Sequence, residues 1–145
     1  MSDPITHMTA TVEGDTGHAA VNRWKTPIVT KVKGRCQVRM TLGANYRKWR
    51  TRAARVFRVA AAGRMFEPGA LIVHVDAYWP TMHRTGHAAG LPRGDVDAVV
   101  KATLDALTHG GVIADDAVVV RAPLAKHYDK DHPRIVIEVA RWSGP

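Results

Sequence analysis

Several features that mark specialised classes of protein are absent from this sequence of 145 residues. Its one cysteine, Cys36, has no intramolecular disulfide partner, which favours a reducing, cytoplasmic compartment. No apolar run approaches the roughly 18 residues of a membrane span, and the first residues lack the basic start and apolar stretch of a secretory signal. We therefore predict one cytoplasmic domain that does not contact a membrane and that buries a core without disulfides.

Acidic residues are also absent from a long basic segment, because no Asp or Glu stands between Asp15 and Glu67 in a chain of net charge +8. The cations of this segment are Arg23, Lys25, Lys31, Lys33, Arg35, Arg39, Arg47, Lys48, Arg50, Arg52, Arg55, Arg58 and Arg64. A surface kept basic for solubility alone would intersperse both signs of charge. Unmixed positive charge is typical of proteins that neutralise phosphates, so the segment predicts a nucleic-acid partner.

Hydrophobic spacing predicts a small single α+β domain, with a mixed or antiparallel sheet packed against two main helices. We expect residues 1–18 to form a flexible arm or an early strand, and residues 19–145 to form the domain. A basic hairpin or pair of loops is predicted around Gly34. The expected strands are residues 70–80, 117–124 and 134–142, the last two separated by a polar turn at 125–133.

The two predicted helices differ in their apolar faces. Residues 45–63 place Tyr46, Trp49, Ala53, Val56 and Ala60 at helical spacing, with Lys and Arg on the other faces. The second helix starts at Val96 and ends at the glycines that follow His109. Its predicted apolar stripe is Val96, Val100, Leu104 and Leu107.

Carboxylates gather around one lysine near this second helix. Asp95 and Asp97 stand two residues apart at its start, and Lys101 follows Asp97 by about one helical turn. Asp115 and Asp116 come after the helix, and spacing alone does not decide whether they reach its N-terminus. If the carboxylates converge, their mutual repulsion favours a divalent ion. Their hard oxygens suit Mg²⁺ or Mn²⁺.

Such an ion would activate water against a scissile phosphate. Lys101 would hold a phosphate oxygen, stabilise the transition state or assist the attacking water. Structural alternatives stay open at this point. Asp95 or Asp97 would cap the helix, the later acidic pair would form an ordinary turn, and Asp97, Lys101 and Asp105 would form an exposed row of ion pairs.

Residues 93–116 resemble the RusA family of Holliday junction resolvases, which are crossover junction endodeoxyribonucleases. In that family a D-x-D-N element is followed by a lysine, by LDALTH and by a DD pair at constant spacing. Here DVDA, Lys101, LDALTHGG and ADD follow in the same order without a gap. VNRWK at 21–25 and NYRKW at 45–49 are similar to earlier family segments, and the similarity over residues 20–140 implies a RusA-like fold.

The resemblance implies a homodimer in a bacterial or phage-infected cell that resolves four-way junctions by paired symmetric nicks. The reaction would use Mg²⁺ and serve recombination, repair or phage DNA processing. The implied catalytic residues are Asp95, Asp97, Lys101 and Asp116. The implied metal ligands are Asp95, Asp97 and Asp116, with Asp115 as a helper. The predicted DNA contacts are Asn22, Arg23, Lys25, Lys31, Lys33, Arg35, Arg47, Lys48, Arg84 and Arg93.

Two positions depart from the family pattern. Ala98 stands where the family has Asn, so any hydrogen bond from that amide must come from another group. The arginine run before the motif is reduced to Arg93, with His83 and Arg84 in a glycine-containing loop ahead of it. Two rival functions therefore stay open, a nuclease acting more broadly on flaps and branched DNA and a non-catalytic basic DNA-binding module. An RNA-binding module is disfavoured, because no RNP-type aromatic motif or GXXG clamp is present.

Overall fold

The computed structural model describes residues 3–14, 16, 26–41 and 43–145. Its main sheet has five strands in the order β1-β7-β4-β5, and β6 also pairs with β4. β7 runs antiparallel to β1 and β4, whereas β5 and β6 run parallel to β4, so the sheet is mixed. The strands are β1 (His7–Glu13), β4 (Leu71–Trp79), β5 (Val119–Arg121), β6 (Leu124–Tyr128) and β7 (Arg134–Arg141).

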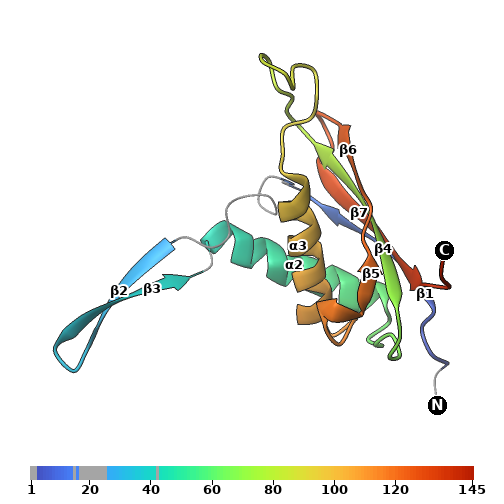
Figure 1. Ribbon diagram of the computed structural model, residues 1–145, viewed down its shortest axis with the longest axis horizontal. Helices are drawn as coiled ribbons and strands as arrows, with labels where there is room; N and C mark the ends of the chain where they lie inside the picture. The colour runs from blue at the N-terminus through green and yellow to red at the C-terminus, as the bar shows by residue number, and fades with distance from the viewer. Residues whose placement is uncertain (1–2, 15, 17–25, 42) are drawn as a thin grey trace.

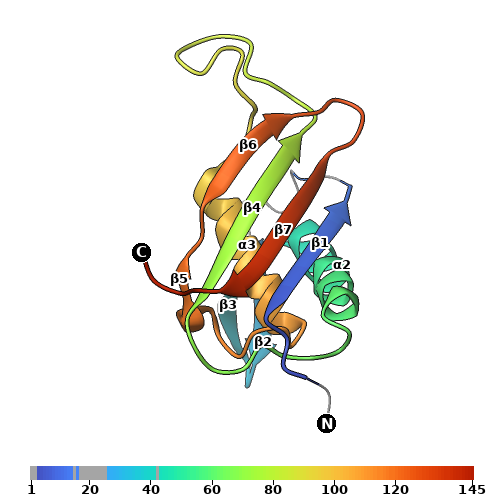
Figure 2. The same cartoon turned by 90° about the vertical axis from the view of Figure 1, so that its right-hand side faces the viewer.

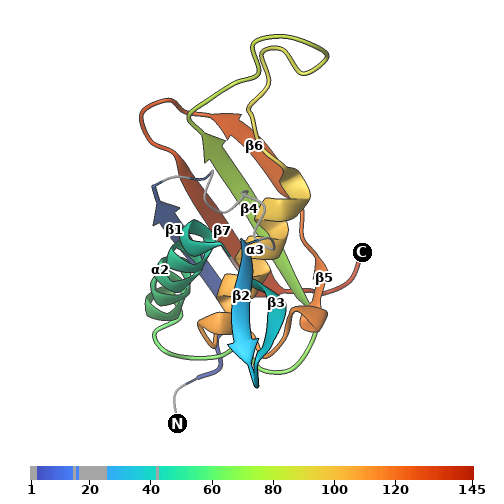
Figure 3. The ribbon, with the colours of Figure 1, turned by 90° about the vertical axis from the view of Figure 1, so that its left-hand side faces the viewer.

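Both helices of the described chain, α2 (Ala44–Ala60) and α3 (Val96–His109), cover one face of this sheet. Figure 3 shows them in front of the sheet, and Figure 2 shows the opposite face without a helix over it. Two helices on one side of a five-stranded mixed sheet confirm the predicted α+β class. Neither helix has the length and apolar character needed to cross a bilayer.

Helix α2 forms where the sequence predicts it, but its buried face is rotated about the helix axis from the predicted one. Tyr46, Trp49 and Ala53 are buried as expected, whereas Val56 is only partly buried and Ala60 is exposed. Phe57 occupies the core position instead and is 0% exposed. At about 100° per residue, Ala54 and Phe57 lie on one side of the Ala53 direction and Val56 and Ala60 on the other, so the face toward the core is rotated about the helix axis from the predicted stripe.

Helix α3 begins at Val96 as predicted, but of its predicted apolar stripe only Leu107 is fully buried, and Leu104 packs against the core while partly buried. Val96 is 41% exposed, and the other two predicted members are only partly buried. The buried face instead carries Ala98, Val99, Ala102, Thr103, Ala106 and Leu107. Most of these buried side chains are small, which lets the helix pack close to its neighbours. The larger Val96, Val100 and Leu104 lie on the more exposed sides of the helix.

The central strand β4 confirms the predicted strand over 70–80, and β7 confirms the strand over 134–142. The strand expected over 117–124 is confirmed only in the short strand β5, because Asp116–Val118 forms a 3₁₀ turn and the next strand, β6, starts at Leu124. β6 also occupies part of the expected polar turn at 125–133. Its side chains are mostly polar and lack the apolar alternation that predicts a strand. Its backbone nevertheless pairs with β4 from Val75↔Leu124 to Trp79↔Tyr128.

Of the two alternatives for residues 1–18, an early strand or a flexible arm, the structure shows the strand, β1. β1 pairs along its whole length with β7 and buries Met8, Ala10 and Val12 on the helix side of the sheet. Small and polar residues made this two-residue alternation weak in the sequence. The sheet therefore starts well before the predicted domain boundary.

The predicted basic hairpin is confirmed as β2 (Thr26–Val32) paired with β3 (Arg35–Thr41). Lys33 and Gly34 form its two-residue turn with φ of 50° and 74°. Positive φ at both central residues matches the right-handed twist of the flanking strands. Figure 1 shows this hairpin extending to one side of the helices and the main sheet.

Candidate active site

Lys101 is the centre of the candidate active site. Its Nζ lies 2.8 Å from Oδ2 of Asp116 and 2.9 Å from Oδ1 of Asp105. The Asp116 contact joins the middle of α3 to the 3₁₀ turn η1 (Asp116–Val118) that follows it. The chain thus returns after α3 and brings one member of the later acidic pair to the lysine, which sequence spacing left undecided.

These contacts shift the pKa values of both partners. The hydrogen bond to Asp116, followed by the one to Asp105, raises the pKa of Lys101. The hydrogen bond from Lys101, followed by its positive charge, lowers the pKa of Asp116. Lys101 is therefore an ammonium and Asp116 a carboxylate at neutral pH. The side chains are 38% and 42% exposed, so both groups stay accessible to a phosphate.

A tyrosine that sequence analysis assigned only to the core belongs to the same network. Tyr46 is 1% exposed, yet its hydroxyl donates a 2.8 Å hydrogen bond to Oδ2 of Asp105. Asp105 thereby receives Tyr46 from α2 through one oxygen and Lys101 from α3 through the other. The i, i+4 spacing of Lys101 and Asp105 was a signal for their ion pair, whereas the tyrosine contact depends on how the two helices pack.

Asp95 and Asp97 occupy the start of α3. Asp95 stands at the N-cap position, but its side chain makes no capping hydrogen bond, so the capping alternative is not supported for this residue. Asp97 lies in the first turn, where the helix dipole favours negative charge. Both carboxylates lie at the N-terminal end of α3, where Asp97 is about one turn and Asp95 nearly two turns before Lys101.

The backbone before Asp95 is held in place by the sheet. Gly94 has φ of 149°, and a Cβ there would lie 2.2 Å from the Trp79 ring. Lys126 on β6 donates 3.1 Å hydrogen bonds to the carbonyls of Pro92 and Gly94. A glycine and a lysine thus fix the point at which α3 and its two carboxylates begin.

Asp115 has a clear local role. Its Oδ1 accepts a 2.7 Å hydrogen bond from the amide of Ala117 and caps the turn η1. This supports the turn alternative for Asp115, whereas Asp116 reaches Lys101. Adjacent residues of one acidic pair therefore do different things, since one orders the backbone and the other contacts the lysine.

The four predicted metal ligands fit a hard divalent ion in their chemistry, because all are carboxylates. Asp95 and Asp97 lie at the start of α3, and Asp115 and Asp116 at η1. Over the ranges that the structure describes, no three His, Cys, Asp or Glu side chains are grouped as a metal-ion site. The donor set therefore agrees with Mg²⁺ in type.

The predicted DNA-contacting residues lie on three separate elements. Lys31, Lys33 and Arg35 are exposed on the β2–β3 hairpin, Arg47 and Lys48 are exposed on α2, and Arg84 and Arg93 are exposed on the loop between β4 and α3. Asn22, Arg23 and Lys25 lie outside the described residues. The described cations thus form several separate basic surfaces.

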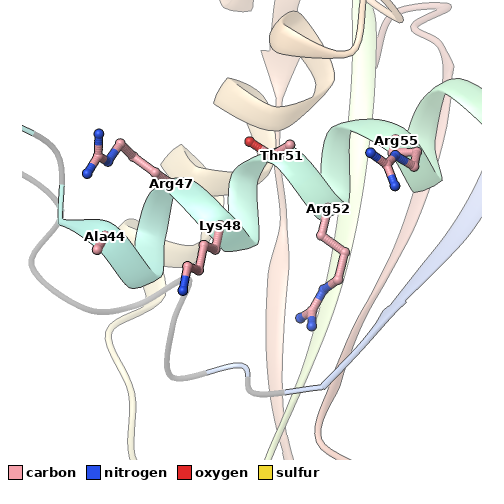
Figure 4. A pocket seen from close by; sticks show the side chains of 6 residues that line it. All are labelled: Ala44, Arg47, Lys48, Thr51, Arg52 and Arg55. Carbon is pink, nitrogen blue, oxygen red and sulfur yellow. The ribbon is translucent and has the colours of Figure 1, made fainter.

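The outer side of α2 carries the densest of these surfaces. Arg47, Lys48, Arg52 and Arg55 line a shallow cavity of about 480 Å³ together with Thr51. Figure 4 shows Lys48 and Arg52 pointing to one side of the helix, with Arg47 and Arg55 toward its two ends. The sequence predicts positive charge on the outer faces of this helix, and in the structure several of these cations border one depression.

Comparison with protein families matches residues 23–140 to the family described as endodeoxyribonuclease RusA. The match includes the predicted catalytic residues Asp95, Asp97, Lys101 and Asp116, and it extends from before the β2–β3 hairpin to near the end of β7. Comparison with curated proteins gives no match.

Proposed function

The chain belongs to the RusA family of endodeoxyribonucleases, and we propose that it resolves four-way DNA junctions by paired symmetric nicks in a Mg²⁺-dependent reaction. The observation that carries this proposal is the ion pair of Lys101 with Asp116 inside the family match. It unites the lysine and a carboxylate that the family resemblance marks as essential. The proposed processes are recombination, repair or phage DNA processing.

Lys101 would act on the phosphate as a cation. Its ammonium contacts the carboxylates of Asp116 and Asp105, so it is suited to bind a phosphate oxygen and to stabilise negative charge that develops in the transition state. A group that keeps its proton is a poor acceptor for a proton from water. Among the roles considered for this lysine, the electrostatic ones are therefore favoured.

Asp95, Asp97 and Asp116 would hold Mg²⁺, or Mn²⁺ in its place, with Asp115 as a helper. The bound ion would supply Lewis-acid stabilisation and a water of lowered pKa. Asp115 contributes by ordering the backbone that carries Asp116, through its bond to the amide of Ala117. Ala98 is buried at 7% exposure in the first part of α3, so a ligand-orienting amide would have to come from another position.

The DNA arms would lie on the basic surfaces of α2 and the β2–β3 hairpin. Phosphate contacts of this kind give affinity without sequence preference. A four-way junction presents two equivalent strands for cleavage, which favours a twofold homodimer with one active site per strand. Sedimentation of the purified protein across a concentration series tests the dimer.

Cleavage of an immobile four-way junction and its matched linear duplex, with and without Mg²⁺, tests the function. Each strand is labelled in turn and the products are run on denaturing gels. We expect paired symmetric nicks on the junction only, lost on chelation of the metal. Cutting of flaps or forks as well would assign the broader nuclease, and binding without cutting would leave a non-catalytic DNA-binding module.

Asp97→Asn is the matched variant for this experiment. Asparagine keeps the shape of the side chain and removes the charge that would bind the ion, so cleavage should fall strongly while the circular dichroism spectrum stays unchanged. Undiminished cleavage by Asp97→Asn would remove this residue from the site and count against the metal proposal.

A further inference from the structure

A second depression lies between the loop at 80–93 and the end of β6. Its volume is about 600 Å³, and Arg84, Arg93, Lys130 and Tyr128 are among the residues that line it. No carboxylate is among its described lining residues. Tyr128 is 45% exposed, and the three cations are exposed as well. The cavity therefore combines an accessible aromatic ring with concentrated positive charge.

Backbone hydrogen bonds hold the walls of this cavity in place. Across the loop, the amide of Arg93 donates to Thr81 at 3.0 Å and the amide of His83 donates to Leu91 at 2.9 Å. At its base, the amide of Asp129 donates to Trp79 at 2.9 Å. The loop in Figure 2 that rises beyond β4 and β6 is thus internally bonded, and little ordering is needed when a ligand binds.

The nearest carboxylate in sequence does not cancel the positive charge. Asp129 follows Tyr128, but its Oδ2 receives a 2.8 Å hydrogen bond from Arg134, and its Oδ1 receives the amides of Asp131 and His132. These bonds turn the carboxylate toward its own loop. Asp129 is therefore paired within its own loop, and the described lining of the cavity carries three cations and no carboxylate.

The cavity adjoins the candidate active site. Arg93 lines it and stands two residues before Asp95. Lys126, two residues before Tyr128, donates to the carbonyls of Pro92 and Gly94 on either side of Arg93. A strand of DNA with its scissile phosphate at Lys101 would therefore have its neighbouring nucleotides within reach of this cavity.

Resting on the proposed function, we propose that this cavity receives an unpaired nucleotide of the DNA substrate beside the cleavage site. Arg84, Arg93 and Lys130 bind its flanking phosphates, and Tyr128 stacks on the base. A base inside a duplex has both faces covered by its neighbours, so stacking on Tyr128 requires a nucleotide that has left the stack. The cavity lies within the size range of small-ligand pockets, about 300–1,000 Å³.

This assignment makes Tyr128 a determinant of substrate structure. Nucleotides at the crossover of a branched substrate leave their stacks more easily than those of a linear duplex, because their pairing or stacking is interrupted. Cations alone would bind both substrates through their phosphates. Tyr128 therefore favours branched over linear DNA, whereas the cations raise affinity for both.

Binding of a short single-stranded oligonucleotide that carries 2-aminopurine tests the inference without requiring cleavage. The wild-type protein is compared with Tyr128→Leu, which keeps an apolar side chain but removes the ring, and with Tyr128→Phe, which keeps the ring. Stacking should quench the fluorescence in wild type and Tyr128→Phe. Tyr128→Leu should lose the quenching and bind roughly 5- to 150-fold more weakly, the equivalent of about 1–3 kcal/mol per stacked base.

The same variants are measured on the four-way junction and on the linear duplex. Weaker junction binding by Tyr128→Leu with unchanged duplex binding supports the inference, with circular dichroism as the check on folding. Equal oligonucleotide binding and quenching by wild type and Tyr128→Leu, or an equal loss on duplex, would overturn it. Failure of the wild-type protein to cut any junction would instead count against the proposed function, and the oligonucleotide result would still decide the role of Tyr128.

Discussion

Lys101 illustrates at the scale of a single residue how one ammonium serves two carboxylates. Asp105 is its neighbour along α3, and Asp116 reaches it from the following turn. The lysine therefore offsets the repulsion that would otherwise arise between these acids. Its charge is held in place by the protein before any DNA binds, which is the arrangement that electrostatic stabilisation of a transition state requires.

Replacing Lys101 by methionine should reduce the single-turnover cleavage rate by about 100- to 1,000-fold, the usual effect of removing one preorganised stabilising group. Lys101→Arg keeps a positive charge and should retain more activity than Lys101→Met. The measurement is the rate of junction cleavage at saturating protein, with affinity measured separately. A rate for Lys101→Met equal to that of the wild type would exclude the lysine from the chemical step.

Tyr46 links the core to this network through one hydroxyl. Tyr46→Phe leaves the ring in place and removes the donor to Asp105, so the free energy of unfolding should fall by about 1–2 kcal/mol. Urea denaturation measures the change. Tyr128→Phe is the matched control, since its surface-exposed hydroxyl should contribute less than about 0.5 kcal/mol. Equal stability of both variants would mean that the Tyr46 hydroxyl adds nothing to the fold.

Asp129 provides a pH-dependent contribution to stability. The hydrogen bond from Arg134 lowers its pKa in the folded protein, so the contribution is present above the usual Asp pKa of about 3.9 and is lost as the pH falls through the lower folded value. Thermal melting of Asp129→Asn and wild type should therefore differ most above about pH 5 and converge in strong acid. A difference that grew toward acid pH would contradict this assignment.

At the scale of elements, the close approach of the two helices depends on Gly110, which follows α3. A Cβ at this position would lie 2.7 Å from the carbonyl oxygen of Ala54 on α2. The Gly110 carbonyl also accepts a 3.0 Å hydrogen bond from Nε of Arg58. Backbone rather than side chain faces this glycine, so neither helix can give way without a shift of its axis.

Gly110→Ala should therefore lower the free energy of unfolding by about 1–3 kcal/mol through overpacking. Chemical denaturation measures this loss. Because the two helices also bring Tyr46 to Asp105, the variant should reduce cleavage as well. A stable, fully active Gly110→Ala protein would show that the helices separate without strain.

At the scale of the whole molecule, charge is divided between elements. The acidic groups around Lys101 lie on α3 and η1, whereas exposed cations lie on α2, the β2–β3 hairpin and the loop before α3. Positive surfaces around an acidic centre would hold the DNA backbone while leaving carboxylates at the scissile phosphate. This division is already visible in the sequence as the segment without acids.

The double variant Arg47→Gln and Lys48→Gln should weaken binding to all DNA substrates to a similar degree. Each lost phosphate contact reduces the slope of log affinity against log salt by about 0.9, so the slope should change by about 1.8 if both residues contact phosphates. Titrations of junction and duplex at several salt concentrations measure it. An unchanged slope would place the DNA away from this end of α2.

Much of the architecture follows from local sequence. Alternation and helical spacing predict α2, β4, α3 and β7, and the turn at Lys33 and Gly34 predicts the hairpin, because these elements depend on nearest neighbours along the chain. The sequence leaves β1 open between a strand and a flexible arm, and it does not predict β6. β1 becomes a strand by pairing with β7, which is remote in sequence. β6 becomes a strand through backbone pairing with β4, although its own side chains show no apolar pattern.

The sequence by itself determined the charge division, the helix that carries Asp97 and Lys101, and the spacing that resembles a nuclease family. Only the tertiary structure decided that Asp116 meets Lys101, that Asp115 caps a turn, and that Tyr46 bonds Asp105. It also decided that Tyr128 and Arg93 border one cavity. The physical reason is that short-range periodicity specifies each element, whereas contacts between elements depend on where the chain returns and how closely its helices pack.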